Sequence, residues 1–236
     1  AGVNYYPGWH PEQMGTPDLV VVGNVAGSTN PEWLRVQEDK IPFVSYPELI
    51  EKYLIAKNSI VCAGTFGKTT STTILSWILS KTGKNPNYMF GGICADSSFP
   101  SAHIENNAEW SVVEGDEYKT AKWDEKAKFF HYHPTHILLT AAVWDHADVY
   151  KTENSYTQAF CELLQLLPNG GTAIISEKAK HLPISENAHV QYYGVQDWCD
   201  IRYTNVLQTK EGTSFTIHSK GQTYAIHTKM LGEFTA

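Results

Sequence analysis

Cysteine is scarce in this chain, and its few copies lie far apart. The four residues Cys62, Cys94, Cys161 and Cys199 form no CxxC pair. Disulfide frameworks and structural zinc sites depend on closely spaced cysteines, so this spacing argues against both. Reduced thiols of this kind are typical of a cytoplasmic protein, and we expect that compartment.

The chain also lacks a long hydrophobic run and an excess of basic residues. No apolar segment approaches the roughly 20 residues that a helix needs to cross a bilayer, and the turn-rich start over 1–8 has no signal-peptide pattern. Lysine and arginine number 18 against 25 aspartates and glutamates, which gives a net charge of −7. This balance argues against a nucleic-acid-coating surface. We therefore expect neither nucleic acid nor membrane as a partner.

The composition is that of a folded protein, and the first 57 residues predict alternating strands and helices. The apolar run 18–22 predicts a strand buried on both faces, as in a parallel sheet. Asn30 and Pro31 are a typical N-cap and first helical residue. A strand over 41–45 and a helix over 47–54 follow. Because no strand with a glycine-rich turn precedes residue 18, we expect 1–57 to be the C-terminal part of a Rossmann-like domain.

A second unit is predicted over 58–236. Apolar runs predict buried strands over 59–63, 110–113, 136–140 and 171–175, with helices over 71–80 and 155–167 between them. Three segments over 201–208, 213–218 and 223–229 predict an antiparallel meander. The fold class expected is therefore α/β, a mostly parallel sheet of the P-loop type with an antiparallel meander, preceded by part of a Rossmann-like domain.

The strongest local signal is the glycine-rich loop between the strand 59–63 and the helix that follows. It comprises Gly64, Thr65, Phe66, Gly67, Lys68, Thr69 and Thr70. Glycines let the backbone approach a polyphosphate, and N–H groups at a helix start favour anions. Lys68 would reach the β- and γ-phosphates of ATP, and the Thr69 hydroxyl would ligate Mg²⁺. The loop is a shortened variant of the usual pattern, because Cys62 stands where its first glycine would be.

Polar residues follow two other predicted strands at their carboxyl ends. Glu114 comes directly after one strand and is the best candidate for a magnesium ligand, whereas Asp116 and Glu117 are equally well explained as a solvated turn. His146, in the pair Asp145-His146, is a candidate for a second metal or for contact with a transferring phosphoryl group. The histidine-rich stretch 131–136 is better explained as the approach to a strand than as a zinc site.

Together these residues resemble the Mur ligases, the ATP-dependent amide-forming enzymes of peptidoglycan synthesis. The resemblance rests on three segments, 63–70, 113–118 and 145–150. Within the family, segment 117–134 is similar to the recycling ligases, which join UDP-N-acetylmuramate to L-alanyl-γ-D-glutamyl-meso-diaminopimelate through an acyl-phosphate. The resemblance implies catalytic roles for Lys68, Glu114 and His146, and metal ligation by Thr69, Glu114 and His146.

The resemblance also implies a division into domains and leaves alternatives open. It makes 1–57 part of a UDP-binding domain and 58–236 a truncated ATP-binding central domain, with the C-terminal ligase domain absent, so this chain alone is expected to be inactive. Departures from the family pattern occur at Phe66, Lys119, Ala141, Val143 and Thr235. The alternatives are a UDP-N-acetylmuramate–L-alanine ligase or a nucleotide-binding module that has lost ligase activity.

Overall fold

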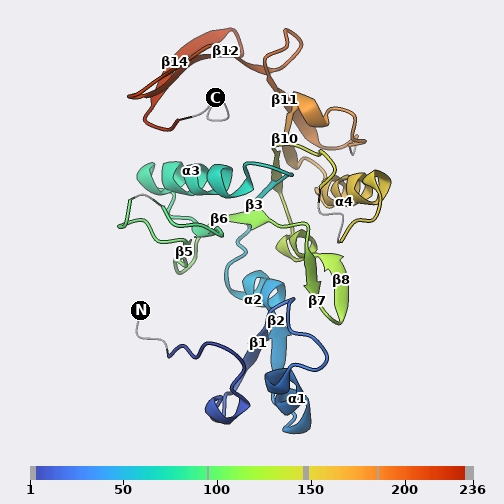
Figure 1. The fold of residues 1–236 in the computed structure, drawn as a ribbon. Coiled ribbons are helices and arrows are strands. Elements are labelled where there is room, and N and C mark those ends of the chain that lie inside the picture. Colours follow the sequence, from blue (N-terminus) through green and yellow to red (C-terminus); the bar gives the residue numbers. More distant parts are fainter. Residues whose placement is uncertain (1–3, 95, 146–148, 185, 232–236) are drawn as a thin grey trace.

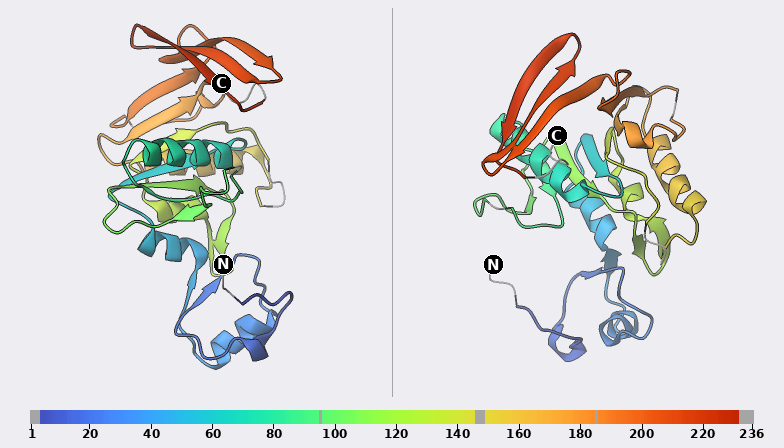
Figure 2. Two further views of the ribbon diagram at one scale, coloured as in Figure 1. Left: turned by 90° about the vertical axis from the view of Figure 1, so that its left-hand side faces the viewer. Right: turned by 45° about the horizontal axis from the view of Figure 1, so that its top comes forward.

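The computed structural model of the chain describes residues 4–94, 96–145, 149–184 and 186–231 (Figure 1). A small N-terminal unit lies at one end of the molecule, and the antiparallel edge of a large sheet lies at the other (Figures 1 and 2). Among the described residues, no helix combines the length and the apolar character that crossing a membrane requires.

The N-terminal unit contains the predicted strand–helix–strand–helix succession. Its elements are η1 (Pro11–Gln13), β1 (Val20–Val22), α1 (Pro31–Glu38), β2 (Phe43–Ser45) and α2 (Tyr46–Tyr53). The Asn30 side chain accepts a hydrogen bond from the Trp33 N–H at 3.0 Å, which confirms the predicted cap. The expectation that the first strand is buried on both faces is wrong. In the described chain β1 pairs with β2 alone, and Val21 is 43% exposed.

Ten strands of the described chain form the large sheet, in the order β14-β13-β12-β11-β10-β9-β3-β6-β4-β5. The pairs from β4 to β12 are parallel, whereas β5 is antiparallel to β4, and β12, β13 and β14 are antiparallel to one another in a meander. The bounds are β3 (Asn58–Ala63), β4 (Asn87–Met89), β5 (Ala102–His103), β6 (Trp110–Gly115), β9 (His136–Leu139), β10 (Thr172–Ser176), β11 (His189–Gly194), β12 (Ile201–Thr209), β13 (Gly212–Ser219) and β14 (Gln222–Thr228). The predicted fold class is confirmed.

Helices cover both faces of this sheet (Figure 1). Alternate residues of β3 point to opposite faces, so Ile60 joins the cluster that includes Leu75 of α3 (Lys68–Lys81), and Val61 joins the cluster that includes Phe160 of α4 (Glu153–Gln165). The short η3 (Glu177–Ala179) follows β10. The cluster that contains Val61 and Phe160 also contains Ile50, so α2 packs on the sheet, whereas β1 and α1 have a small separate cluster of Val22, Trp33 and Val36.

A hairpin next to the sheet contacts the N-terminal unit. It consists of β7 (Lys119–Ala121) and β8 (Asp124–Ala127), and η2 (Lys128–Tyr132) follows it. Trp123 at its tip stacks on Trp33 of α1 with ring centroids 5.1 Å apart. Residues 133–135 lead from η2 into β9, which begins at His136, so the predicted approach to a strand is confirmed, and His131 lies within η2. Its ring bonds both Glu51 of α2, at 3.0 Å, and Asp124 of β8, at 2.9 Å.

Candidate nucleotide-binding site

The glycine-rich loop joins the end of β3 to the start of α3, as the sequence predicts. Gly64 and Gly67 both have positive φ, +130° and +80°, which favours glycine. A Cβ on Gly64 would also lie 2.8 Å from the backbone nitrogen and oxygen of Ala141, so the loop packs closely against the segment after β9. The first turn of α3 begins at Lys68, and the N–H groups of a first helical turn have no partner within the helix. The loop thus has the local geometry of an anion site.

The strand that carries this loop lies between β6, which carries Glu114, and β9. In the sheet, β3 pairs with β6 on one side and β9 on the other, and Cys62 is in register with Glu114. The Thr69 hydroxyl donates a 2.6 Å hydrogen bond to Glu114 Oε1, and Glu114 Oε2 accepts one from the Gly91 N–H at 2.8 Å. Two residues 45 positions apart in sequence are therefore in contact.

The Lys68 side chain folds back over the loop toward Gly64. Its Nζ donates to the Gly64 carbonyl at 2.7 Å and lies 3.1 Å and 3.0 Å from the two carboxylate oxygens of Glu117. Glu117 is buried, whereas the sequence left it as either a functional residue or a solvated turn. Asp116, the other residue left open, pairs at 2.6 Å with Lys128 of η2. Sequence spacing gave no signal for either partner.

A cavity of about 460 Å³ opens in front of the loop, lined by residues 65–70 together with Glu114, Asp116, Tyr118 and Asp145. Among these lining residues Lys68 is the one cation, against three carboxylates. A bare polyphosphate would be repelled by this excess of negative charge, and a divalent cation bound to it would reduce that repulsion. The hydroxyl and carboxylate oxygens of Thr69 and Glu114 are the hard donors that Mg²⁺ prefers, so these residues fit that ion.

Part of the predicted site lies outside the described residues. His146 falls in the undescribed segment 146–148, and Thr235 in 232–236. Within the part of the chain that the structure describes, no group of three or more histidine, cysteine, aspartate or glutamate side chains is placed to hold a metal ion. Phe66, at the predicted loop position, is 63% exposed. Burial raises the pKa of the Cys62 thiol to about 12, so Cys62 packs beneath the loop as a neutral group.

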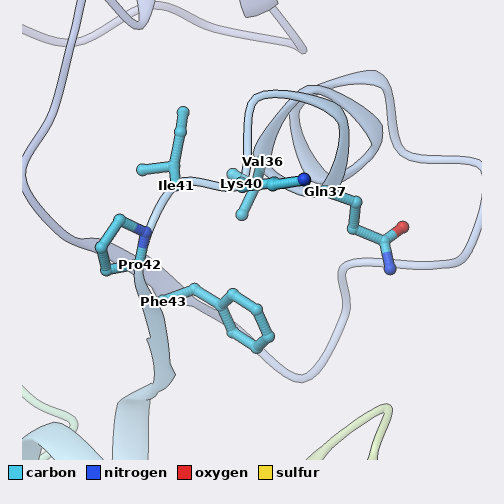
Figure 3. Close-up of a pocket in the computed structure, with 6 residues that line it drawn as sticks. All are labelled: Val36, Gln37, Lys40, Ile41, Pro42 and Phe43. Atoms are coloured by element: carbon cyan, nitrogen blue, oxygen red, sulfur yellow. The ribbon is translucent and has the colours of Figure 1, made fainter.

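A second hollow, of about 550 Å³, lies in the N-terminal unit (Figure 3). It is lined by Val36, Gln37, Lys40, Ile41, Pro42 and Phe43. Lys40 is the one charged residue in this lining, and no carboxylate accompanies it. The loop cavity, with its lysine, hydroxyl and carboxylates, is therefore the better candidate for chemistry.

A family model described as "Mur ligase middle domain" matches residues 62–236, which include the loop, Glu114 and the meander. The chain belongs to the Mur ligase family. This finding confirms the resemblance deduced from the sequence motifs. Mur ligases are ATP-dependent enzymes, so the family accounts for a phosphate loop in this position.

Two groups of curated Mur ligases are similar to the chain. The UDP-N-acetylmuramate–L-alanyl-γ-D-glutamyl-meso-2,6-diaminoheptanedioate ligase of Escherichia coli K12 is 32% identical over 75% of this chain and 38% of its own length. A UDP-N-acetylmuramate–L-alanine ligase of Desulfitobacterium hafniense is 29% identical over 92% of the chain and 45% of its own length. The chain thus spans less than half of either relative.

Solved Mur ligase structures share the fold. The ligase of the diaminopimelate-peptide type from Neisseria meningitides superposes with a TM-score of 0.81 at 24% identity, covering 98% of this chain and 74% of that one. A MurF ligase from Thermotoga maritima, solved in complex with ADP, superposes with a TM-score of 0.65 at 13% identity, covering 92% of this chain and 56% of that one. At these identities the likeness supports the fold alone.

Proposed function

We propose that the whole product of the gene encoding this chain is an ATP-dependent ligase of peptidoglycan recycling. It joins UDP-N-acetylmuramate to L-alanyl-γ-D-glutamyl-meso-diaminopimelate. The contact of Thr69 with Glu114, beside Lys68 at the ends of adjacent strands, carries this proposal. Residues 1–57 would belong to a UDP-binding domain and 58–236 to the ATP-binding domain. A further C-terminal domain would be required for ligation.

The choice of the recycling reaction rests on the hairpin and on the relatives. Segment 117–134, whose sequence is similar to the recycling ligases, contains β7, β8 and η2. Two relatives that bear the recycling ligase's name are 32% and 28% identical to the chain. This makes the tripeptide the first amine to test, ahead of L-alanine.

The chemistry requires neutralisation of charge more than a nucleophilic side chain. A carboxylate oxygen of UDP-N-acetylmuramate attacks the γ-phosphorus of ATP, ADP leaves, and the peptide amine then attacks the acyl carbon as phosphate leaves. The ammonium of Lys68 and the N–H groups at the start of α3 stabilise the phosphoryl oxygens. Thr69 and Glu114, with His146, would hold Mg²⁺, which neutralises charge on the phosphates when bound.

The experiment is ADP release by the whole gene product with MgATP and UDP-N-acetylmuramate, comparing the tripeptide, L-alanine and no amine. We expect release that depends on the tripeptide and is abolished in a folded Lys68→Ala variant. Release with L-alanine alone would replace the proposal with the first synthetic step. MgATP binding without stimulation by either amine would indicate a module that has lost ligation. Wild-type turnover in Lys68→Ala would contradict the role of the loop.

A further inference from the structure

A buried carboxylate lies directly beside the phosphate loop. Glu117 is 1% exposed, and its two carboxylate oxygens lie 3.0 Å and 3.1 Å from Lys68 Nζ. A negative charge in this position opposes the approach of phosphate and is expensive to bury, so it does not help the loop through charge alone. Its contact is with the one cation that lines the described cavity wall. Through this contact Glu117 can act on the position of Lys68.

The carboxylate is held in place by the protein without any nucleotide. The Tyr156 hydroxyl, on α4, donates to Glu117 Oε1 at 3.3 Å, and the Tyr150 hydroxyl donates to the Glu117 backbone carbonyl at 2.7 Å. Burial, and then the nearby charge of Glu117, raise the pKa of the Tyr156 hydroxyl, so it keeps the proton that it donates. The same hydroxyl lies 3.1 Å from Thr65 Oγ1 in the loop. Glu117 is thus fixed relative to the loop from a helix on one face of the sheet.

The lysine is restrained by this arrangement. An ammonium group has three donors; the Gly64 carbonyl accepts one, and Glu117 Oε1 accepts another. Nζ is then held at the mouth of the loop with donor capacity left for a phosphate oxygen. Without the carboxylate, Gly64 would be its one fixed partner, and the long side chain would sample several rotamers.

We propose that Glu117 is a positioning residue for Lys68. It fixes the ammonium before nucleotide arrives, so that the transferring phosphoryl group meets a cation already in place. This inference rests on the phosphate-binding role proposed above for the loop. Because preorganised charge stabilises a transition state more than a ground state, Glu117 affects kcat more than the KM for MgATP.

The first variant is Glu117→Gln, which keeps the shape of the side chain and removes its charge. In the whole gene product we expect kcat to fall about 10- to 100-fold while KM for MgATP stays within about threefold. Glu117→Asp, which keeps the charge but shortens the side chain, should recover part of kcat. Tyr156→Phe, which removes one hydrogen bond to the carboxylate, should lower kcat by about threefold and serves if Glu117→Gln does not fold. Glu125→Gln, which breaks the exposed pair with Lys119, is the matched control and should leave kcat unchanged.

A second measurement requires no nucleotide. In this 236-residue chain, the ¹H–¹⁵N signal of the Lys68 ammonium, assigned by its loss in Lys68→Met, reports whether Nζ is held. We expect a resolved signal in the wild type and its loss by exchange with water in Glu117→Gln. A mainly structural role would leave the signal in the folded fraction unchanged.

The outcomes distinguish the positioning role of Glu117 from the proposed ligase function. The positioning role is overturned if folded Glu117→Gln has the wild-type kcat. It is also overturned if kcat falls only in proportion to the loss of folded protein. An ammonium signal unchanged in that variant overturns it as well. If the wild type does not bind MgATP, the proposed function fails instead, and the ammonium signal still decides whether Glu117 holds Lys68.

Discussion

At the residue scale, the loop is the part of the site that sequence could identify. Its function depends on local backbone chemistry, so the glycines, Lys68 and Thr69 carry a signal that needs no knowledge of the fold. The partner of Lys68 could not be found in this way. Glu117 lies 49 positions away, and it is tertiary packing, including the contact with Tyr156 of α4, that places it buried beside the loop. Until that burial is known, its sequence context describes a solvated turn equally well.

The first glycine of the loop allows a test of this close packing. Gly64→Ala places a Cβ 2.8 Å from backbone atoms of Ala141 at a positive φ, so we expect about 3–5 kcal/mol of destabilisation and loss of MgATP binding. Gly83→Ala is the matched control, because Gly83 also has positive φ (+78°) but nothing within 4 Å of its Cβ position. That variant should lose about 1 kcal/mol and bind MgATP normally. Urea unfolding and calorimetric titration measure both, and equal losses in the two variants would show that the contact with Ala141 is unimportant.

At the element scale, strands that stand out as apolar runs were predictable, including the short β1 and β2, whereas β4 and β5 were not. Strands β3, β6, β9 and β10 appear in the sequence as buried apolar runs, and parallel strands bring their carboxyl ends to one edge. In contrast, β4 and β5 are three and two residues long and are too short to show a period. The β7–β8 hairpin is rich in charged residues and is held by contacts with distant elements, such as Trp123 on Trp33.

The link between the hairpin and α2 should depend on pH. Burial opposes charge on His131, but hydrogen bonds to Glu51 and Asp124 outweigh it and raise its pKa. Stability from this contact is therefore fully present below the unfolded pKa of about 6.5 and is lost as pH rises through the higher folded value. Glu51, whose pKa is lowered, also faces His133, and its contribution declines only in acid, below about pH 4.5.

The test compares thermal unfolding of the wild type and His131→Gln between pH 5.5 and 8.5. Because Glu51 is partly exposed, we expect an advantage of about 1 kcal/mol, or about 2–4 °C in Tm, for the wild type at pH 5.5. That advantage should shrink as pH rises. His189→Gln, on the exposed start of β11, is the control and should show no such trend. An advantage that is constant with pH would mean that His131 contributes by packing rather than by its charge.

At the scale of the whole molecule, the fold class followed from the alternation of elements, whereas the order of strands in the sheet did not. The placement of β3 between β6 and β9 is decided by tertiary packing, and this placement brings Thr69 to Glu114. One core cluster then runs from Ile50 of α2 to Phe160 of α4. The N-terminal unit joins this core through α2, and Trp33 of α1 stacks on Trp123 of the hairpin, although β1 and α1 also form a small cluster of their own. Because of these two links, the N-terminal unit and the nucleotide site should unfold together.

This continuity makes a prediction for ligand binding to the chain. With free MgATP at 100 times its Kd, linkage should add about 2.7 kcal/mol and raise Tm on the order of 5–10 °C. We expect a single calorimetric transition that shifts as a whole. Chelating the metal with EDTA should remove most of the shift in Tm, because the carboxylates of the cavity then face an uncompensated polyphosphate. With metal present, Lys68→Met should also remove the shift in Tm. Two transitions, of which only one moves with MgATP, would instead show that the N-terminal unit unfolds independently of the site.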